Sequence, residues 1–260
     1  MLFFGRSGRR VNSLFIKHIS IEQPLNNVRY YAVLPAVRAL CETPLTLRRP
    51  VTFLVGENGV GKSTLLEAIA IALGFNPEGG SKNFNFSTAD SHADLYRFLR
   101  IAKGVTAPRD GYFLRAESFY NVASHIDELD RSTMMGPPII QSYGGISLHE
   151  QSHGESFLAL AEERFGGHGL YLLDEPEAAL SPMRQMRLLC RIDQLVKQNS
   201  QFIISTHSPI LMTYPGAQVL QIDQGGIREV SYWETEAFRL TRRFLNDPAH
   251  MLQLLLQDEK

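Results

Sequence analysis

Residues 56–64 read GENGVGKST and match the pattern G-x-x-x-x-G-K-[ST]. Glycines in such a stretch let the backbone curl until its N–H groups point inward at phosphate oxygens. An apolar strand is expected at 51–55, and a helix from about 62 to 73 would turn its positive end toward the anion. By chance, the four fixed positions would match in roughly one chain of this length in a hundred. The stretch therefore predicts a phosphate-binding loop between a buried strand and a helix.

The chemistry of the loop assigns a role to its last polar residues. Lys62 is expected to reach the β- and γ-phosphates of a nucleotide, and the hydroxyl of Ser63 is expected to bind Mg²⁺. The predicted nucleotide-binding residues of the loop are Gly56, Glu57, Asn58, Gly59, Val60, Gly61, Lys62, Ser63 and Thr64.

Two adjacent acids follow a second apolar stretch, LYLLDEP at 170–176. We expect Asp174 to hold Mg²⁺, directly or through water, opposite Ser63. Glu175 would act as the general base or orient the attacking water. Two solvated acids at an ordinary strand end would give the same letters, but the phosphate loop upstream favours the catalytic interpretation.

The order of the motifs resembles that of the ABC ATPase superfamily, from Val51 to about Ile210. QSHGES at 151–156 is similar to the ABC signature, although His153 stands where the family has its first glycine. The resemblance implies that Ser152, Gly154 and Glu155 contact the γ-phosphate of ATP held by an opposite subunit. A capping box, in which a serine N-cap is followed three residues later by Glu155, explains the same pattern, and both interpretations can hold together.

Two more family positions follow the acidic pair. EAALSP at 177–182 resembles the D-loop with Ser181 in place of the usual aspartate, so Ser181 either contacts a second subunit or caps the next helix. His207, in STHSP after an apolar strand, matches the switch histidine, which implies that it contacts the γ-phosphate.

The remaining family positions are matched by candidates only. Glu117, in YFLRAES, stands where the family places a glutamine, and the resemblance implies a role at Mg²⁺ or water; Gln141 is the alternative. Tyr30 and Tyr31 lie upstream, where an adenine-stacking residue would be expected, but they would equally pack in an N-terminal sheet.

Apolar strands alternate with helix-like segments, which predicts an α/β fold. We expect a single ABC-type domain over 1–260, with a mostly parallel core sheet, an N-terminal antiparallel sheet and a small inserted helical lobe at approximately 76–150. The lobe includes a helical pattern around Leu95, Phe98 and Leu99. Helices are further expected at 154–165, at 182–198 (with Met186, Leu189, Ile192 and Val196 on one face) and in two segments at the end of the chain, the second opening at 247–248. Strands are expected at 14–21, 30–34, 112–114, 170–173, 201–205, 218–222 and 227–230.

The composition limits the class of protein. A net charge of -1 over 260 residues excludes a globally basic surface for nucleic acid, though the arginines at 6–10 and 48–49 could form a local patch. The two cysteines, Cys41 and Cys190, are expected to be reduced in a cytoplasmic protein. No apolar run approaches the ~20 residues of a membrane span, and the N-terminus reverses the order of a secretory signal, so direct membrane insertion is not expected.

The resemblance implies Mg²⁺-dependent ATP binding and hydrolysis between two facing copies of the chain. The acid at 117 and the DEPEAALSP segment favour the non-transporter branch, which includes chromosome-condensing, DNA-repair and defence ATPases. The distance from Lys62 to Ser152 leaves no room for a long coiled coil. We therefore expect a molecular switch acting on nucleic acid or on a partner protein; the alternative is the ATP-binding subunit of a membrane transporter.

Overall fold

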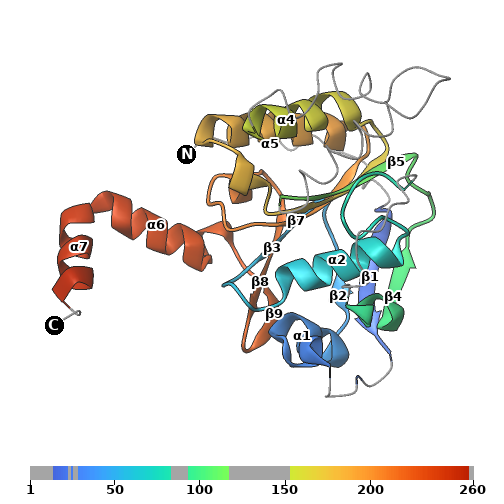
Figure 1. Cartoon of the computed structure of the whole chain (residues 1–260), viewed down its shortest axis with the longest axis horizontal. Coiled ribbons are helices and arrows are strands. Elements are labelled where there is room, and N and C mark those ends of the chain that lie inside the picture. The colour runs from blue at the N-terminus through green and yellow to red at the C-terminus, as the bar shows by residue number, and fades with distance from the viewer. Residues whose placement is uncertain (1–13, 23–24, 26–28, 83–92, 117–152, 258–260) are drawn as a thin grey trace.

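The computed structural model describes residues 14–22, 25, 29–82, 93–116 and 153–257, and the following statements concern these residues (Figure 1). Glu117, Gln141, Ser152 and the arginines at 6–10 lie outside them. The strands are β1 (Ile16–Ile21), β2 (Leu45–Thr46), β3 (Val51–Val55), β4 (Leu99–Lys103), β5 (Asp110–Arg115), β6 (Gly169–Asp174), β7 (Gln201–Ser205), β8 (Gln218–Asp223) and β9 (Gly226–Glu229). The helices are α1 (Pro35–Glu42), α2 (Lys62–Ala72), α4 (His153–Ala159), α5 (Pro182–Lys197), α6 (Glu236–Asn246) and α7 (Pro248–Gln257).

The core sheet has the strand order β5-β6-β7-β3-β8-β9. Every neighbouring pair runs parallel except β8 and β9, which form the antiparallel hairpin expected from the sequence. Because parallel strands end at the same edge, the loops that follow β3, β6 and β7 meet there. This confirms the mostly parallel α/β sheet and places the two motifs of the sequence beside each other.

Successive side chains of the central strands alternate between two buried clusters, as the period of a strand requires. Phe53 and Tyr171 pack with α5 and with Phe157 of α4, whereas Leu54 and Leu172 pack with α1 and α2. All five residues of β3 and all six of β6 are buried. Helices on both faces explain why these strands are continuous apolar runs rather than alternating ones.

The N-terminal antiparallel sheet, predicted from the sequence, has the order β2-β1-β4. Two buried glutamines of the core sheet hold it in place. The side-chain oxygen of Gln201 accepts hydrogen bonds from the backbone N–H groups of Phe15 and Ile16, at 2.8 and 3.0 Å. The amide of Gln218 donates to the carbonyl oxygen of Thr46 at 3.1 Å. These bonds satisfy polar groups that burial would otherwise leave without partners.

Two sequence predictions were wrong in this part of the chain. The stretch predicted as a strand at 30–34 is a 3₁₀ helix, Tyr30–Val33, because the chain turns there into α1, which begins at Pro35. The helical pattern around Leu95 is only a 3₁₀ turn, Asp94–Phe98, and Leu99 begins β4 instead. Pairing with β1 overrides the local helical spacing.

The described residues of the expected inserted lobe contain the 3₁₀ turn Asp94–Phe98 but no α-helix. β4 belongs to the N-terminal sheet and β5 forms one end of the core sheet, so this part of the range is built into the two sheets. The prediction for 117–150 lies outside the described residues. The helix expected at 154–165 begins as α4 and continues as a π-helical turn, Leu160–Arg164.

The other helices occur where the sequence predicts them. In α2, Gly74 ends the helix at φ +86°, and Phe75 N–H donates to the carbonyl of Ala70, which is the Schellman arrangement. The predicted face of α5 was wrong at one position: Met186 is exposed, while Leu188 and Ile192 are buried. Asp247 caps α7 by accepting a hydrogen bond from His250 N–H at 3.1 Å. No helix of the described ranges is long and apolar enough to cross a membrane.

Candidate nucleotide site

The loop between β3 and α2 has the backbone of a phosphate cradle. Gly56, Gly59 and Gly61 all have positive φ, at 148°, 82° and 95°. A Cβ on Gly56 would lie 2.2 Å from the carbonyl oxygen of Ile222, so no other residue fits there. A Cβ on Gly59 would meet nothing within 4 Å, and the loop tip faces open space. The loop therefore packs closely on β8 at Gly56 and exposes its tip at Gly59.

Lys62, the first residue of α2, lies across the mouth of this loop. Its side chain is buried, and its ammonium donates hydrogen bonds to the carbonyl oxygens of Gly56 and Glu57, both at 2.8 Å. Burial lowers the pKa of Lys62, while the charges of Glu175, Asp174 and Glu177 oppose this shift. The ammonium thus lies between two backbone carbonyls and a group of acids, where an anion could replace the carbonyl contacts.

Ser63 and Asp174 meet although 111 residues separate them, and Ser63 Oγ donates to Asp174 Oδ1 at 3.0 Å. Burial raises the pKa of Asp174 to about 6, against the opposing effects of the Ser63 hydroxyl and the Arg115 charge. Arg115 lies with Nε 4.0 Å from Asp174 Oδ2, and its Nη1 is 2.6 Å from Glu67. Sequence analysis missed Arg115; its position at the end of β5, beside β6, was the available signal.

Glu175 and His207 follow β6 and β7, and they face each other with Oε1 and Nε2 3.7 Å apart. Glu175 is one of three described non-glycine residues with positive φ, at 48°. This left-handed conformation costs about 1 kcal/mol or more and is found at functional sites. Glu175 N–H donates to the Ser205 carbonyl at 3.0 Å, which ties the bend to β7. The predicted pair is therefore brought together, with both side chains partly exposed.

Glu177 is a second residue that the sequence analysis did not single out. Its Oε1 accepts a hydrogen bond from His207 N–H at 2.5 Å, while its Oε2 is buried without a hydrogen bond in the described residues. The carboxylate thus connects the turn after Glu175 to the loop that carries His207. The only sequence signal for Glu177 was that it is an acid two residues after Glu175. The contact between the loops after β6 and β7 cannot be read from the sequence.

Of the signature residues, Gly154 and Glu155 are described. Gly154 is buried, and a Cβ there would lie 2.6 Å from both the Ala179 carbonyl oxygen and Arg184 Nη1. Glu155 forms an ion pair with Arg184 at 2.8 Å. The N-terminus of α4 is therefore packed against the turn that carries Glu177. Neither contact shows which interpretation of the signature holds, since Ser152 lies outside the described residues.

The structure bears on two further sequence predictions, the role of Ser181 and the choice between Tyr30 and Tyr31 for contact with adenine. Ser181 occupies the N-cap position of α5 but its side chain makes no capping hydrogen bond, and it is exposed. Tyr31 is buried, and its hydroxyl donates to Asp94, so it packs beside the N-terminal sheet rather than offering a face to adenine. Tyr30 is 66% exposed and remains a candidate for adenine contact.

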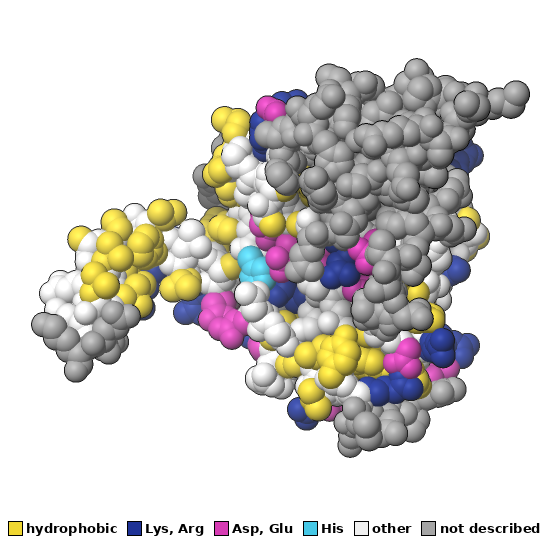
Figure 2. Space-filling view, viewed as in Figure 1, with side chains coloured by type: hydrophobic (Ala, Val, Ile, Leu, Met, Phe, Trp, Pro, Cys, Tyr) yellow, Lys and Arg dark blue, Asp and Glu magenta, His cyan; other side chains and the backbone are white. Residues whose placement is uncertain are grey.

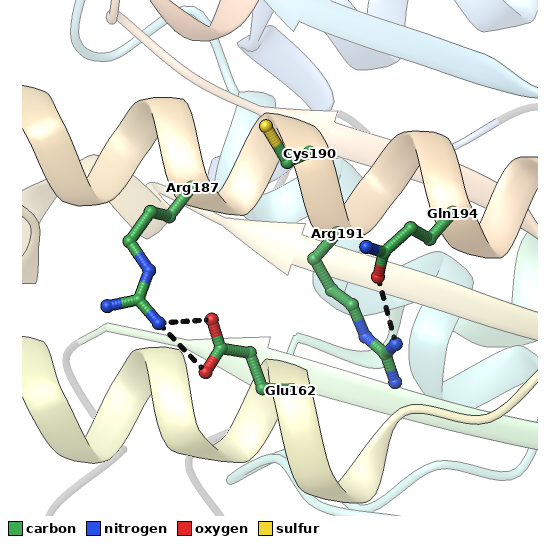
Figure 3. Close-up of a pocket in the computed structure, with 5 residues that line it drawn as sticks. All are labelled: Glu162, Arg187, Cys190, Arg191 and Gln194. Carbon is green, nitrogen blue, oxygen red and sulfur yellow. Dashed lines mark hydrogen bonds and ion pairs between the residues drawn. The ribbon is translucent and has the colours of Figure 1, made fainter.

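A hollow of about 290 Å³, separate from the phosphate loop, lies between α5 and the π-helical turn that follows α4 (Figure 3). Its two arginines are engaged: Arg187 pairs with Glu162 at 2.9 Å, and Arg191 donates to the Phe165 carbonyl at 2.7 Å. Cys190 lies beside them as a free, exposed thiol. These contacts fasten α5 to the π-helical turn, and we assign the hollow no chemistry.

Two protein-family models match the chain. An AAA domain matches residues 25–107, and an AAA ATPase domain matches residues 149–212. The first range includes the phosphate loop, and the second includes Asp174, Glu175 and His207. The matches therefore cover both halves of the site described above.

Two curated proteins are similar in sequence. An "Uncharacterized ABC transporter ATP-binding protein" of Haemophilus influenzae is 29% identical over 193 residues, which are 66% of this chain and 69% of that protein. A protein of Vibrio cholerae described as "Retron Vc95 probable ATPase" is 28% identical over 133 residues, 45% of this chain. The match spans only 25% of the length of the Vibrio protein.

Among solved structures, the chain is similar to a nucleotide-free ATP-binding cassette from an ABC transporter, with a TM-score of 0.48 and 16% identity over 90% of this chain and 96% of that one. It is also similar to the SMC head domain from Thermotoga maritima, with a TM-score of 0.43 and 16% identity over 84% of this chain and 100% of that one. The family matches, the sequence relatives and the phosphate loop together support an ATP-binding P-loop protein that is similar to ATPases of the AAA/ABC type.

Proposed function

We propose that the chain hydrolyses ATP in a Mg²⁺-dependent reaction at the interface of a head-to-tail homodimer. The observation that carries this proposal is the convergence of Lys62, Ser63, Asp174, Glu175 and His207 at one edge of the core sheet. Positioning and charge stabilisation account for most of the catalysis of phosphoryl transfer, and these residues supply both.

The donor set fits Mg²⁺. A serine hydroxyl and a carboxylate oxygen lie 3.0 Å apart, and hard divalent cations take oxygen ligands of this kind. Asp174 is buried, and burial raises its pKa despite the nearby Arg115 charge, so a bound cation would offset part of the cost of keeping this carboxylate ionised. Ser63 and Asp174 would hold the ion, which, when bound, neutralises charge that develops on the phosphates. The sequence analysis also predicted Glu117 as a possible Mg²⁺ ligand, and this residue lies outside the described residues.

The chain's own residues would act as follows. Lys62 exchanges the Gly56 and Glu57 carbonyls for phosphate oxygens, while backbone N–H groups of the loop bind the same anion. Glu175 takes a proton from the attacking water or orients it, which its partly exposed carboxylate permits. His207 contacts the γ-phosphate, and Glu177 holds the backbone of the His207 loop in position.

The dimer follows from the signature segment. Ser152, Gly154 and Glu155 would bind the γ-phosphate of ATP held by the second copy, so two identical heads related by a two-fold axis complete two sites at once. Contacts to the γ-phosphate exist only before hydrolysis, so ATP favours the closed dimer and ADP the open state.

Light scattering behind a sizing column tests the proposal. Glu175→Gln should bind ATP, hydrolyse it barely, and run as a dimer with ATP but as a monomer with ADP. Adding Ser152→Arg should break that dimer while ATP affinity per chain stays the same. An identical mass for Glu175→Gln with ATP, ADP and no nucleotide would show that this chain alone does not form the ATP dimer.

For the biological role, we propose a molecular switch acting on nucleic acid or on a partner protein. The retron-associated ATPase among the similar proteins supports this class. The Haemophilus relative favours the second candidate, an ATP-binding subunit of a membrane transporter. Purifying tagged Glu175→Gln from its source with ATP separates the two: a co-purified integral membrane protein supports the transporter, and a soluble protein or nucleic acid supports the switch.

A further inference from the structure

Helices α6 and α7 form an extension that we call the C-terminal arm, Glu236–Asn246 and Pro248–Gln257 (Figure 1). Neither helix has a buried residue. The arm nevertheless exposes a series of large apolar side chains, and Figure 2 shows a hydrophobic patch on the outer part of the arm, where α6 meets α7. They are Leu240 (58% exposed), Leu245 (71%), Leu252 (45%), Leu254 (42%), Leu255 (58%) and Leu256 (67%).

The apolar residues of the arm share faces. In α7, Leu252, Leu255 and Leu256 are spaced three and four residues apart and lie on one side, whereas Gln253 and Gln257 form a polar strip between Leu256 and Leu254. Pro248–Gln257 contains no Asp, Glu, Lys or Arg. Helices of 10 and 11 residues are marginal in water without tertiary packing. A leucine face on so short a helix is therefore expected to be covered by another surface.

The arm begins beside the nucleotide site. A hollow of about 180 Å³ is lined on one side by Gly56, Glu57 and His207, and on the other by Glu236 and Leu240 of α6. The first turn of the arm therefore lies against the phosphate loop and the switch histidine. This is the surface that the proposed function turns toward a second copy of the chain, so a partner seated there would lie next to the arm.

Charge along α6 indicates which partner fits. Glu234, just before α6, and Glu236, its first residue, lie at the N-terminal end, whereas Arg239, Arg242 and Arg243 follow along the helix. Two such helices placed antiparallel across a two-fold axis bring the acids of each opposite the arginines near the C-terminal end of the other. A nucleic acid or an anionic lipid surface would meet the two acids at the start of the arm beside these arginines, and no Lys or Arg on α7.

From this geometry we propose that the C-terminal arm is a dimerisation element, which packs its leucine face against the arm of a second copy. The proposal rests on the ATP-dependent dimer of the proposed function and names a surface that strengthens it. Because Glu236 and Leu240 line the same hollow as Gly56 and His207, a movement of the His207 loop would act on the start of the arm. ATP would thereby bring the two arms together, and ADP would let them part.

The test compares two pairs of substitutions in the Glu175→Gln full-length chain with ATP. Leu252→Asp with Leu255→Asp places two charges on the leucine face, and Gln253→Asp with Gln257→Asp places the same charges on the polar strip of the same helix. Sedimentation equilibrium measures the dimer Kd, and calorimetry measures ATP affinity. We expect the leucine pair to raise the dimer Kd at least ~10-fold and the glutamine pair to change it less than ~2-fold, with ATP affinity equal in all three proteins.

Any of the following outcomes would overturn the proposed role of the arm in dimerisation. Equal Kd values for the two pairs, with an intact ATP-dependent dimer, would overturn the arm's role and leave the proposed function standing. A Glu175→Gln protein that stays monomeric with ATP would overturn the proposed function and the arm's role with it. If phosphatidylserine vesicles sediment the unsubstituted arm but not the leucine pair, while the dimer Kd is unchanged, the arm binds a lipid surface instead.

Discussion

The nucleotide site and the C-terminal arm lie next to each other but differ in how far their side chains are buried. In the site, Lys62 and Asp174 are 4% and 7% exposed, and each contacts groups from other loops or elements. In the arm, Leu245 and Leu256 are 71% and 67% exposed, and α7 packs mainly on α6. The side chains of the site are thus held by contacts within one chain, whereas most of the arm's leucines are not covered by the described part of this chain. Substitutions in the two regions should therefore affect different measurements.

The largest expected effect is at Lys62. Lys62→Ala should weaken ATP binding at least ~100-fold, about 2.7 kcal/mol, because charge-assisted hydrogen bonds to phosphate are lost. Its melting temperature without nucleotide should stay within ~2 °C, since the two bonds of Lys62 end on loop carbonyls beside solvent. Calorimetry and a thermal melt measure the two quantities, with Lys197→Ala on exposed α5 surface as the control. Unchanged ATP affinity in folded Lys62→Ala would contradict the phosphate site.

Asp110 provides a half-buried ionic contact with Arg164 at the opposite end of β5 from Arg115. Burial would raise its pKa, but hydrogen bonds from Gly166 N–H, the Tyr171 hydroxyl and Arg164 outweigh this and hold the pKa below its ordinary value. A carboxyl with a lowered folded pKa contributes stability above its unfolded pKa of 3.8 and loses it as the pH falls through the folded pKa.

Asp110→Asn should therefore lower the free energy of unfolding by about 1–3 kcal/mol at pH 7, and the difference from wild type should shrink below pH 4. Urea unfolding at several pH values measures it. Asp223→Asn removes an exposed carboxylate that pairs with Arg228 at 3.0 Å, and should cost under ~0.5 kcal/mol. A difference for Asp110→Asn that stays constant down to pH 3 would rule out the carboxylate as its cause.

Glu177 carries the next effect, on catalysis rather than stability. Glu177→Ala should lower kcat about 10-fold, roughly 1.4 kcal/mol, because the His207 backbone loses its 2.5 Å hydrogen bond. KM should change less than ~2-fold, since Lys62 and the loop remain. Glu177→Gln keeps an acceptor oxygen and should restore kcat to within ~3-fold of wild type. Steady-state kinetics with exposed Glu163→Gln as the control decides this; an alanine variant with wild-type kcat would mean that the bond does not position His207.

The sequence predicted most of what continuous patterns determine. The apolar runs at 51–55, 170–173 and 201–205 are β3, β6 and β7 in the structure. They could be predicted because a strand that is buried on both faces has apolar residues at nearly every position. The phosphate loop could be predicted because its glycines occupy positions with positive φ, and because Gly56 lies too close to the Ile222 carbonyl for a side chain. In these stretches, local chemistry and the final fold make the same demand.

What the sequence did not show depends on contacts between distant segments. Glu177 acquires its role only when the loops after β6 and β7 lie side by side, and no local pattern contains this pairing. Leu99 to Lys103 alternates as a strand does, but Leu95 and Leu99 also fit helical spacing, and pairing with β1 decided between them. The exposed leucines of α6 and α7 fit a helical pattern whether or not a partner covers them.

The smallest expected effect separates the two regions most clearly. Leu255→Ala should change the free energy of unfolding of the nucleotide-free monomer by under ~0.5 kcal/mol, because the 58% exposed side chain loses little burial in a single copy. Leu188→Ala, a fully buried change in α5, should cost about 2–5 kcal/mol in the same urea experiment. Dilute protein without ATP is needed, since association would add the stability of the dimer. If Leu255→Ala destabilised the dilute monomer as much as Leu188→Ala does, the arm would have to fold back on its own chain, and its leucines would not be available to a second copy.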